Sequence, residues 1–249
     1  MRLVFALDAL PALRHATGAD IDVAAAATLA ELAGADAVRL GIDDALKPVS
    51  EHDVSEVRRS ARDFELRMPA NPGLVKIALE ARPDLVLLAA GAREGLDGSS
   101  LVGTAGRALD LGSGSGGRKG GNRNPLAPVM RPLAEAGIET WLRIAPRLDA
   151  VKAAHGEGAA GVEIFTGGIV DLPRSERDTE LEALRDAVRL ASKLHMSIGL
   201  GGGLGYRTVP QVLEGAPAAG GVAVGRELVS RAILVGLDRA LRDLKKLIA

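Results

Sequence analysis

Eight short apolar runs, separated by helical patterns, recur along this chain and restrict its fold more than any other feature. We expect strands at Leu3–Leu7, Ala37–Leu40, Phe64–Met68, Leu85–Leu88, Thr140–Ile144, Gly161–Phe165, Ser197–Leu200 and Gly221–Val224. Short runs that are apolar at most positions are typical of strands buried on both faces. Eight strand–helix units within 249 residues favour an α/β fold of the closed (β/α)8 (TIM) barrel type over an open doubly wound sheet.

Start and stop signals predict several of the helices between these strands. Ala24–Leu32 has a helical pattern, and a shorter helix is expected to end near Ala136. Thr179-Glu180-Leu181-Glu182 has the form of a capping box, which predicts a helix from there to about Leu194. The last helix is expected to span Glu227–Leu247 as one element with an apolar stripe. Because no linker interrupts the pattern, residues 1–249 are expected to form a single barrel domain.

Composition excludes several classes of function. The formal net charge is −1, which gives no reason to expect nucleic acid or an anionic membrane as a partner. Zero cysteines exclude disulfides, thiolate metal sites and a cysteine nucleophile. The apolar run at the N-terminus is too short for a signal peptide, and no run is long enough to span a bilayer. A cytoplasmic protein is therefore expected.

One long connection, residues 90–125, breaks the regular alternation. It is rich in glycine and serine, contains Arg118 and Lys119, and follows the fourth strand on the face where barrel active sites lie. A connection of this length is either a lid over a ligand, with cations that reach an anion, or a flexible solvated insertion. The sequence leaves both interpretations open.

Two glycine turns near the end of the chain indicate a phosphate site. The first contains Gly201, Gly202 and Gly203, and the second contains Gly225 followed by Arg226. Glycine lets backbone N–H groups approach an anion closely, and a helix N-terminus adds a favourable partial charge. Turns after strands 7 and 8 are where (β/α)8 barrels commonly hold phosphate, so a phosphorylated small molecule is the expected ligand. The alternative is a pair of plain strand-to-helix turns.

Ionisable residues lie within the expected strands or just beyond them, at Asp8, Arg39, Asp43, Arg67, Arg143 and Glu163. Charges in apolar strands are costly to bury unless they are paired or face a ligand. In one hypothesis, Arg39 and Arg67 bind an anionic group of the substrate, and Asp8, Asp43 or Glu163 is the acid–base group. For Glu163 that role requires burial to raise its pKa. The other hypothesis is that these residues only pair with one another as an inert network.

Histidine and metal chemistry find little support in the sequence. None of the four histidines lies at the C-terminal end of an expected strand, and no histidine pair has the spacing of metal ligands. Neither a metal nor a cofactor is expected.

Motifs spread from Leu3 to Leu247 resemble pyridoxine 5'-phosphate synthase, the PdxJ family. They are Leu7-Asp8, Leu13-Arg14, Gly34-Ala35-Asp36, Asp53-Val54, Leu133-Ala134-Glu135-Ala136-Gly137-Ile138, Val162-Glu163-Ile164-Phe165-Thr166-Gly167, Gly203-Leu204-Gly205-Tyr206 and Val224-Gly225-Arg226. The resemblance implies a (β/α)8 barrel with added helices, assembled as an octamer. It also implies condensation of 3-amino-2-oxopropyl phosphate with 1-deoxy-D-xylulose 5-phosphate to pyridoxine 5'-phosphate. A homo-oligomer is therefore expected.

The chain departs from the family at positions that the resemblance makes catalytic. The family's strand-2 histidine falls on Gly41, and its substrate-binding arginine falls on Asp43. Its strand-3 glutamate falls on Arg67, and its histidine in the turn after strand 7 falls on Gly202. The histidine after the strand-6 glutamate falls on Phe165. Glycine offers no proton, and a guanidinium is not a base near neutral pH.

Two further departures lie in strand 1, where the family's asparagine and histidine fall on Ala6 and Ala9. The matching positions that survive are Asp8, Glu163, Thr166, Gly167, Gly203, Gly225 and Arg226. Thr166 and Gly167 are accordingly expected to bind substrate. The phosphate site is thus retained, while the proton-transfer groups are replaced.

Three functions remain open. The first is a family member that binds a phosphorylated small molecule and performs altered chemistry. The second is a non-catalytic descendant that binds a ligand or serves assembly. The third is a pyridoxine 5'-phosphate synthase of vitamin B6 biosynthesis with substitute catalysts such as His15, Arg118 or Lys119.

Overall fold

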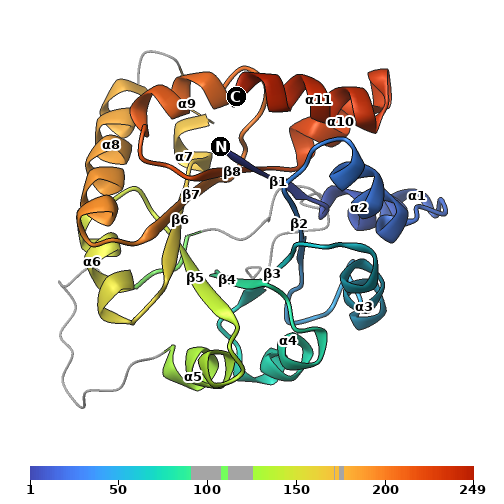
Figure 1. Cartoon of the computed structure of the whole chain (residues 1–249), viewed down its shortest axis with the longest axis horizontal. Coiled ribbons are helices and arrows are strands. Elements are labelled where there is room, and N and C mark those ends of the chain that lie inside the picture. Colours follow the sequence, from blue (N-terminus) through green and yellow to red (C-terminus); the bar gives the residue numbers. More distant parts are fainter. Residues whose placement is uncertain (91–107, 112–125, 171, 174–176) are drawn as a thin grey trace.

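Eight parallel strands close into a barrel in the order β1-β2-β3-β4-β5-β6-β7-β8, and helices surround it (Figure 1). A computed structural model describes residues 1–90, 108–111, 126–170, 172–173 and 177–249. The predicted (β/α)8 barrel is therefore confirmed. Most of the 90–125 connection, including Arg118 and Lys119, lies outside the described residues, so neither interpretation of it is tested.

The strands are β1 (Arg2–Ala6), β2 (Ala37–Gly41), β3 (Phe64–Pro69), β4 (Leu85–Ala89), β5 (Glu139–Ile144), β6 (Gly161–Phe165), β7 (Ser197–Gly201) and β8 (Gly221–Val224). The helices are α1 (Ala9–Thr17), α2 (Val23–Leu32), α3 (Glu51–Ser60), α4 (Val75–Ala81), α5 (Ala127–Glu135), α6 (Leu148–Gly156), α7 (Gly167–Val170), α8 (Arg177–Lys193), α9 (Val209–Gly215), α10 (Arg226–Val235) and α11 (Leu237–Leu247), with a 3-10 turn at Pro72–Leu74. Every predicted strand is present, with each boundary within one residue of the expectation.

Two helix predictions are wrong in detail. The single helix expected over Glu227–Leu247 is broken at Gly236, whose φ of 82° ends α10 and turns the chain into α11. Ile233 is 73% exposed, so it does not belong to a buried stripe that continues through both helices. Thr179 lies inside α8, which begins at Arg177, rather than capping its start.

The main apolar core lies between the outer surface of the barrel and the helices. Alternate strand residues such as Leu3, Phe5 and Leu40 point outward into it and are fully buried. The inner face of the barrel is different, because it carries ionic side chains and many glycines. Its small apolar cluster, formed by Val4, Ala37 and Ala223, is separate from the main core. The strand periodicity thus sends apolar residues outward and leaves charged residues inside the barrel.

No helix in the described ranges is both long enough and apolar enough to cross a lipid bilayer.

Candidate functional site

The two glycine turns meet at the C-terminal rim of the barrel, beyond the ends of β7 and β8. Gly202 and Gly203 have φ angles of 102° and 73°, a region that L side chains rarely adopt. Gly225 precedes α10, which begins with the exposed Arg226. A Cβ placed on Gly203 would lie 3.9 Å from Nη2 of Arg226, so the first turn adjoins the helix start. The expected phosphate-site residues are therefore close together.

Thr166 fixes the shape of the first turn from below. Its hydroxyl donates to the carbonyl oxygen of Gly202 at 2.7 Å, and its backbone N–H donates to Gly201 at 2.8 Å. The side chain is fully buried, and Gly167 beside it is buried at the start of α7. These contacts give Thr166 a positioning role for the glycine turn.

The Phe165 ring, on the last residue of β6, occupies space beside this turn. A Cβ built on Gly202 would lie 2.5 Å from the ring, and one on Gly167 would lie 2.4 Å from it. Contacts this short exclude any side chain at either position unless the ring moves. Phe165 therefore fills the volume that a side chain at position 202 would need.

A similar contact between a large side chain and a glycine occurs on the other side of the rim. Arg67 extends from β3 over Gly41 of β2 to Asp8, with 3.1 Å between Nη1 and Oδ2. The other carboxylate oxygen of Asp8 accepts the backbone N–H of Gly41 at 2.6 Å. A Cβ on Gly41 would lie 2.1 Å from Nη2 of Arg67. The missing side chain at position 41 is what makes room for this guanidinium.

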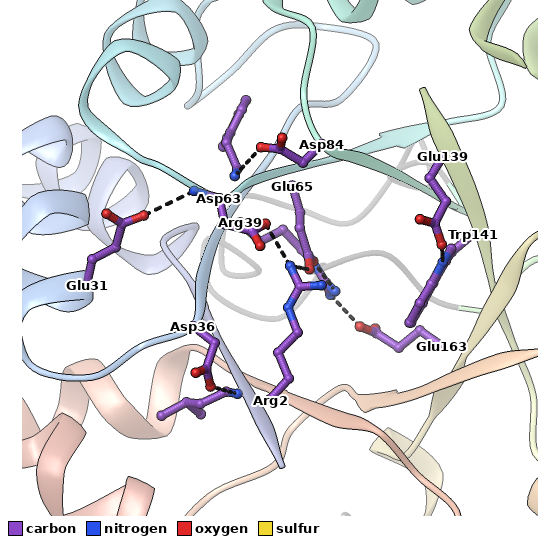
Figure 2. Close-up of polar contacts among 12 residues, drawn as sticks. Arg2, Glu31, Asp36, Arg39, Asp63, Glu65, Asp84, Glu139, Trp141 and Glu163 are labelled. Carbon is purple, nitrogen blue, oxygen red and sulfur yellow. Dashed lines mark hydrogen bonds and ion pairs between the residues drawn. The ribbon is translucent and has the colours of Figure 1, made fainter. Parts of the chain in front are cut away.

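Deeper in the barrel, four charged side chains form a buried ionic network. Nε of Arg39 donates to Glu65 at 2.8 Å, and Nη1 of Arg39 contacts Glu163. Nε of Arg143 donates to the other oxygen of Glu163 at 2.8 Å. None of the four is more than 3% exposed. Figure 2 shows Arg39, Glu65 and Glu163 directed toward one another inside the barrel.

The network stabilises the charged form of Glu163. Burial alone favours the neutral acid, but the positive charges of Arg143 and Arg39 outweigh it and lower the pKa of Glu163 to about 2. Burial, together with nearby Arg67 and Arg39, lowers the pKa of Arg143 to about 10. Burial likewise opposes the charge of Arg39, yet the carboxylates of Glu163 and Glu65 raise its pKa.

These positions separate the predicted site residues into two groups. Asp8 and Arg67 lie at the rim, whereas Arg39, Arg143 and Glu163 are paired below it. The condition for an acid–base role of Glu163, that burial raise its pKa, is not met, because two guanidinium groups flank the carboxylate.

Asp43 is half-buried just after β2, and its carboxylate accepts the N–H groups of Ala45 and Lys47 in its own loop. The described contacts do not join it to the residues at the rim. All four histidines are exposed, His15 on α1 among them. Within the described part of the chain, no three His, Asp or Glu side chains are grouped so that they could hold a metal ion.

One member of the network, Glu65, and Arg2 beside it were missed from the sequence. Glu65 lies two residues before Arg67, so strand alternation places both on the inner face of β3. Nη2 of Arg2 contacts Glu65 at 3.0 Å and Asp63 at 2.7 Å. The same alternation was the available signal for Arg2, since it precedes Val4 and Ala6 on the inner face of β1.

Comparisons with known proteins agree on one family. The model of the family described as "Pyridoxal phosphate biosynthesis protein PdxJ" matches residues 3–249. Pyridoxine 5'-phosphate synthase from Syntrophotalea carbinolica is 33% identical over 254 residues, covering 97% of this chain and 96% of that protein. The protein of the same name from Geobacter metallireducens is 34% identical over 249 residues, with 97% and 96% covered.

Solved structures are similar in fold. Thiamine phosphate pyrophosphorylase from Pyrococcus furiosus is 17% identical with a TM-score of 0.58, covering 99% of this chain and 95% of that chain. Phosphoribosyl anthranilate isomerase from Thermus thermophilus is 12% identical with a TM-score of 0.56, covering 100% and 98%. At these identities the similarity concerns the barrel alone.

Proposed function

This chain belongs to the PdxJ family of pyridoxal phosphate biosynthesis proteins, and we propose that it binds a phosphorylated small molecule and performs chemistry different from the family condensation. The ligand site is the C-terminal rim. The phosphate-binding residues are Gly201, Gly202, Gly203, Gly225 and Arg226.

The observation that carries the phosphate assignment is the approach of Arg226 to the Gly202–Gly203 turn. The turn presents backbone at two positive φ angles, and α10 is 10 residues long, so its N-terminus adds a favourable partial charge. Arg226 is exposed and supplies a forked donor for phosphate oxygens. Thr166 and Gly167 support the turn from beneath.

The observation that supports altered chemistry is the paired filling of positions 41 and 202. By the family resemblance these positions carry catalytic histidines, whereas here Arg67 and Phe165 occupy the space beside two glycines. Each large side chain needs the neighbouring glycine, so the two replacements at each place fit one another sterically. Asp8 is the carboxylate that remains at the rim, and we assign it the acid–base role there. Asp43 stays a weaker candidate, because its described contacts, through Oδ1 to the N–H groups of Ala45 and Lys47, do not join it to the residues at the rim.

Glu163 fits a structural role better than a catalytic one. With a pKa of about 2 the carboxylate is charged at neutral pH, and both of its oxygens accept from arginine. Arg39 is similarly committed to Glu65 and Glu163, which leaves Arg67 as the inner arginine closest to a substrate at the rim. This pairing also favours the second candidate, a ligand-binding barrel without catalysis.

Binding of inorganic phosphate tests the site directly by calorimetry. Arg226→Gln is expected to weaken binding about 10- to 100-fold, the usual cost of losing a charged hydrogen bond. Arg242→Gln, which removes a charge from exposed α11, serves as the matched control. Equal binding by the protein and both variants, or no binding at all, would rule out the assigned phosphate site.

We also propose that the chain forms a homo-oligomer. Leu29 and Leu32 on α2 are 54% and 73% exposed, and Ile233 and Leu234 on α10 are 73% and 83% exposed. Both helices adjoin α11 in the ring around the barrel (Figure 1). Clusters of exposed apolar side chains of this kind are typical of interfaces.

A further inference from the structure

A cavity of about 320 Å³ opens at the N-terminal end of the barrel, opposite the rim. Its mouth lies among the first residues of β1, β7 and β8, and its inner wall includes Trp141, Arg39 and Glu163. Nothing in the proposed rim chemistry uses this space.

Glycine on two neighbouring strands, β7 and β8, creates the cavity. Gly199 of β7 is in register with Gly221 of β8, and Gly221 is in register with Arg2 of β1. Gly199, Gly221 and nearby Ala223 present almost no side chain to the interior, although inward residues usually fill a barrel of eight strands. The missing volume is therefore concentrated on one side of the barrel.

Trp141 forms a flat and well-fixed border of the cavity. Its indole lies so close to β6 and β7 that a Cβ on Gly161 or Gly199 would approach the ring to 2.5 Å or 3.0 Å. The indole Nε1 donates to Glu139 at 2.6 Å, which holds the ring orientation (Figure 2). A rigid indole beside bare glycine backbone suits a planar ring better than a branched or globular molecule.

The charges at the cavity set the charge of its ligand. Arg2 and Arg39 are balanced by Glu65 and Glu163, and Arg39 is fully occupied by the two carboxylates. Arg2 is only partly paired. Its Nη2 contacts Asp63 and Glu65, but its buried Nε has no acceptor among the described residues. A buried donor without a partner is unfavourable, and the part-exposed Arg2 guanidinium keeps hydrogen-bonding capacity beyond its contacts with Asp63 and Glu65. The two carboxylates disfavour a dianion, so a single negative charge fits best.

We propose that this cavity is a binding site for a small planar monocarboxylate, with the carboxylate on Arg2 and the ring beside Trp141. The cavity volume is close to the lower limit of about 300 Å³ for small-molecule sites, which suits one ring. The site is independent of the rim, because it lies at the other end of the barrel.

The chain offers its own reporter for this proposal, because Trp141 is its only tryptophan. Titration with benzoate is expected to change the tryptophan emission saturably. Benzamide has the same shape without the charge and is expected to bind at least 10-fold more weakly. This comparison uses the unaltered protein, so it does not depend on how any variant folds. Inorganic phosphate at a saturating concentration is expected to leave the benzoate titration unchanged.

Two variants locate the binding. Arg2→Gln is expected to weaken benzoate at least 10-fold, whereas Arg131→Gln removes a charge from exposed α5 and leaves binding unchanged. Ala223→Leu fills the cavity and is expected to abolish the emission change, with folding checked by circular dichroism. The proposal is overturned by an unresponsive emission, by equal affinity for benzoate and benzamide, or by benzoate binding that survives both Arg2→Gln and Ala223→Leu.

Discussion

Arg67 reaches Asp8 across the backbone of Gly41, with 3.1 Å between its Nη1 and Oδ2 of the carboxylate. Arg67 lies on β3 and Asp8 follows β1 directly before α1, and β2 lies between these two strands. Their ion pair closes part of the rim where the family resemblance predicts a histidine and a glutamate. The arrangement of Asp8, Gly41 and Arg67 is sterically self-consistent, and it differs from the one that the resemblance implies.

This arrangement predicts strong coupling between positions 41 and 67. Gly41→Ala places a methyl group where Nη2 of Arg67 lies, so it is expected to cost about 1–3 kcal/mol of unfolding free energy. In an Arg67→Ala background the guanidinium is absent, and the same methyl is expected to cost clearly less. A double-mutant cycle by urea unfolding measures the coupling. Strictly additive costs would show that Arg67 does not occupy this space.

Gly202 should behave in a similar way, with one difference. Gly202→Ala meets the ring of Phe165 and also forces an L residue to a φ of 102°, so a loss of more than about 1 kcal/mol is expected. Phe165→Ala relieves the contact but leaves the backbone strain. Thermal unfolding of the single and double variants should therefore show partial rescue; complete rescue, or none, would contradict this explanation.

Glu163 is expected to contribute stability that depends on pH. Its pKa falls from 4.5 to about 2 on folding, so the folded state favours the carboxylate. The contribution is fully present above the unfolded pKa of 4.5 and is lost as pH falls toward 2. Urea unfolding should therefore show a loss on the order of 3 kcal/mol across this range.

Glu163→Gln tests the origin of that loss. The variant leaves Arg39 and Arg143 without their shared carboxylate, so its unfolding free energy at pH 7 is expected to be about 3–5 kcal/mol lower. Its stability should then change less between pH 4.5 and pH 2 than that of the parent protein. Glu135→Gln on exposed α5 provides a control with the same chemical change. An equal pH dependence in parent and Glu163→Gln would exclude Glu163 as the source.

The proposed oligomer depends on exposed apolar residues of α10. Leu234 is 83% exposed, so Leu234→Asp should not disturb the barrel core. We expect the variant to have a smaller mass than the parent by light scattering after gel filtration. If the variant and the parent have the same oligomeric mass, the interface does not include Leu234. If the parent is a monomer, the proposed oligomer is excluded.

Much of the barrel was predictable from the sequence because its strands are short, apolar and regularly spaced. The break at Gly236 was missed because the apolar pattern of α10 and α11 continues through the glycine. The glycine turns could be located because glycine itself is the signal there. Their position beside Arg226 was predicted only from the general geometry of a (β/α)8 barrel, in which the turns after strands 7 and 8 lie together.

The ion pairs were harder to predict than the residues that form them. Arg39 and Glu163 are 124 positions apart and meet only when the barrel closes. Whether a strand charge faces a ligand or a partner depends on that closure, and the sequence left both possibilities open. The direction of the Glu163 pKa shift could not be predicted for the same reason. Burial raises the pKa of a carboxyl group, and the pKa falls here only because two arginines lie beside it.

We propose that this PdxJ-family barrel keeps a phosphate site but not the family's proton-transfer groups. The most direct test is to incubate the folded protein with 3-amino-2-oxopropyl phosphate and 1-deoxy-D-xylulose 5-phosphate and to measure pyridoxine 5'-phosphate. Binding of the phosphorylated substrates without product formation is the predicted result. Sustained formation of pyridoxine 5'-phosphate would show that the chain performs the family reaction, with other residues in place of the side chains that the resemblance implies at Gly41 and Gly202.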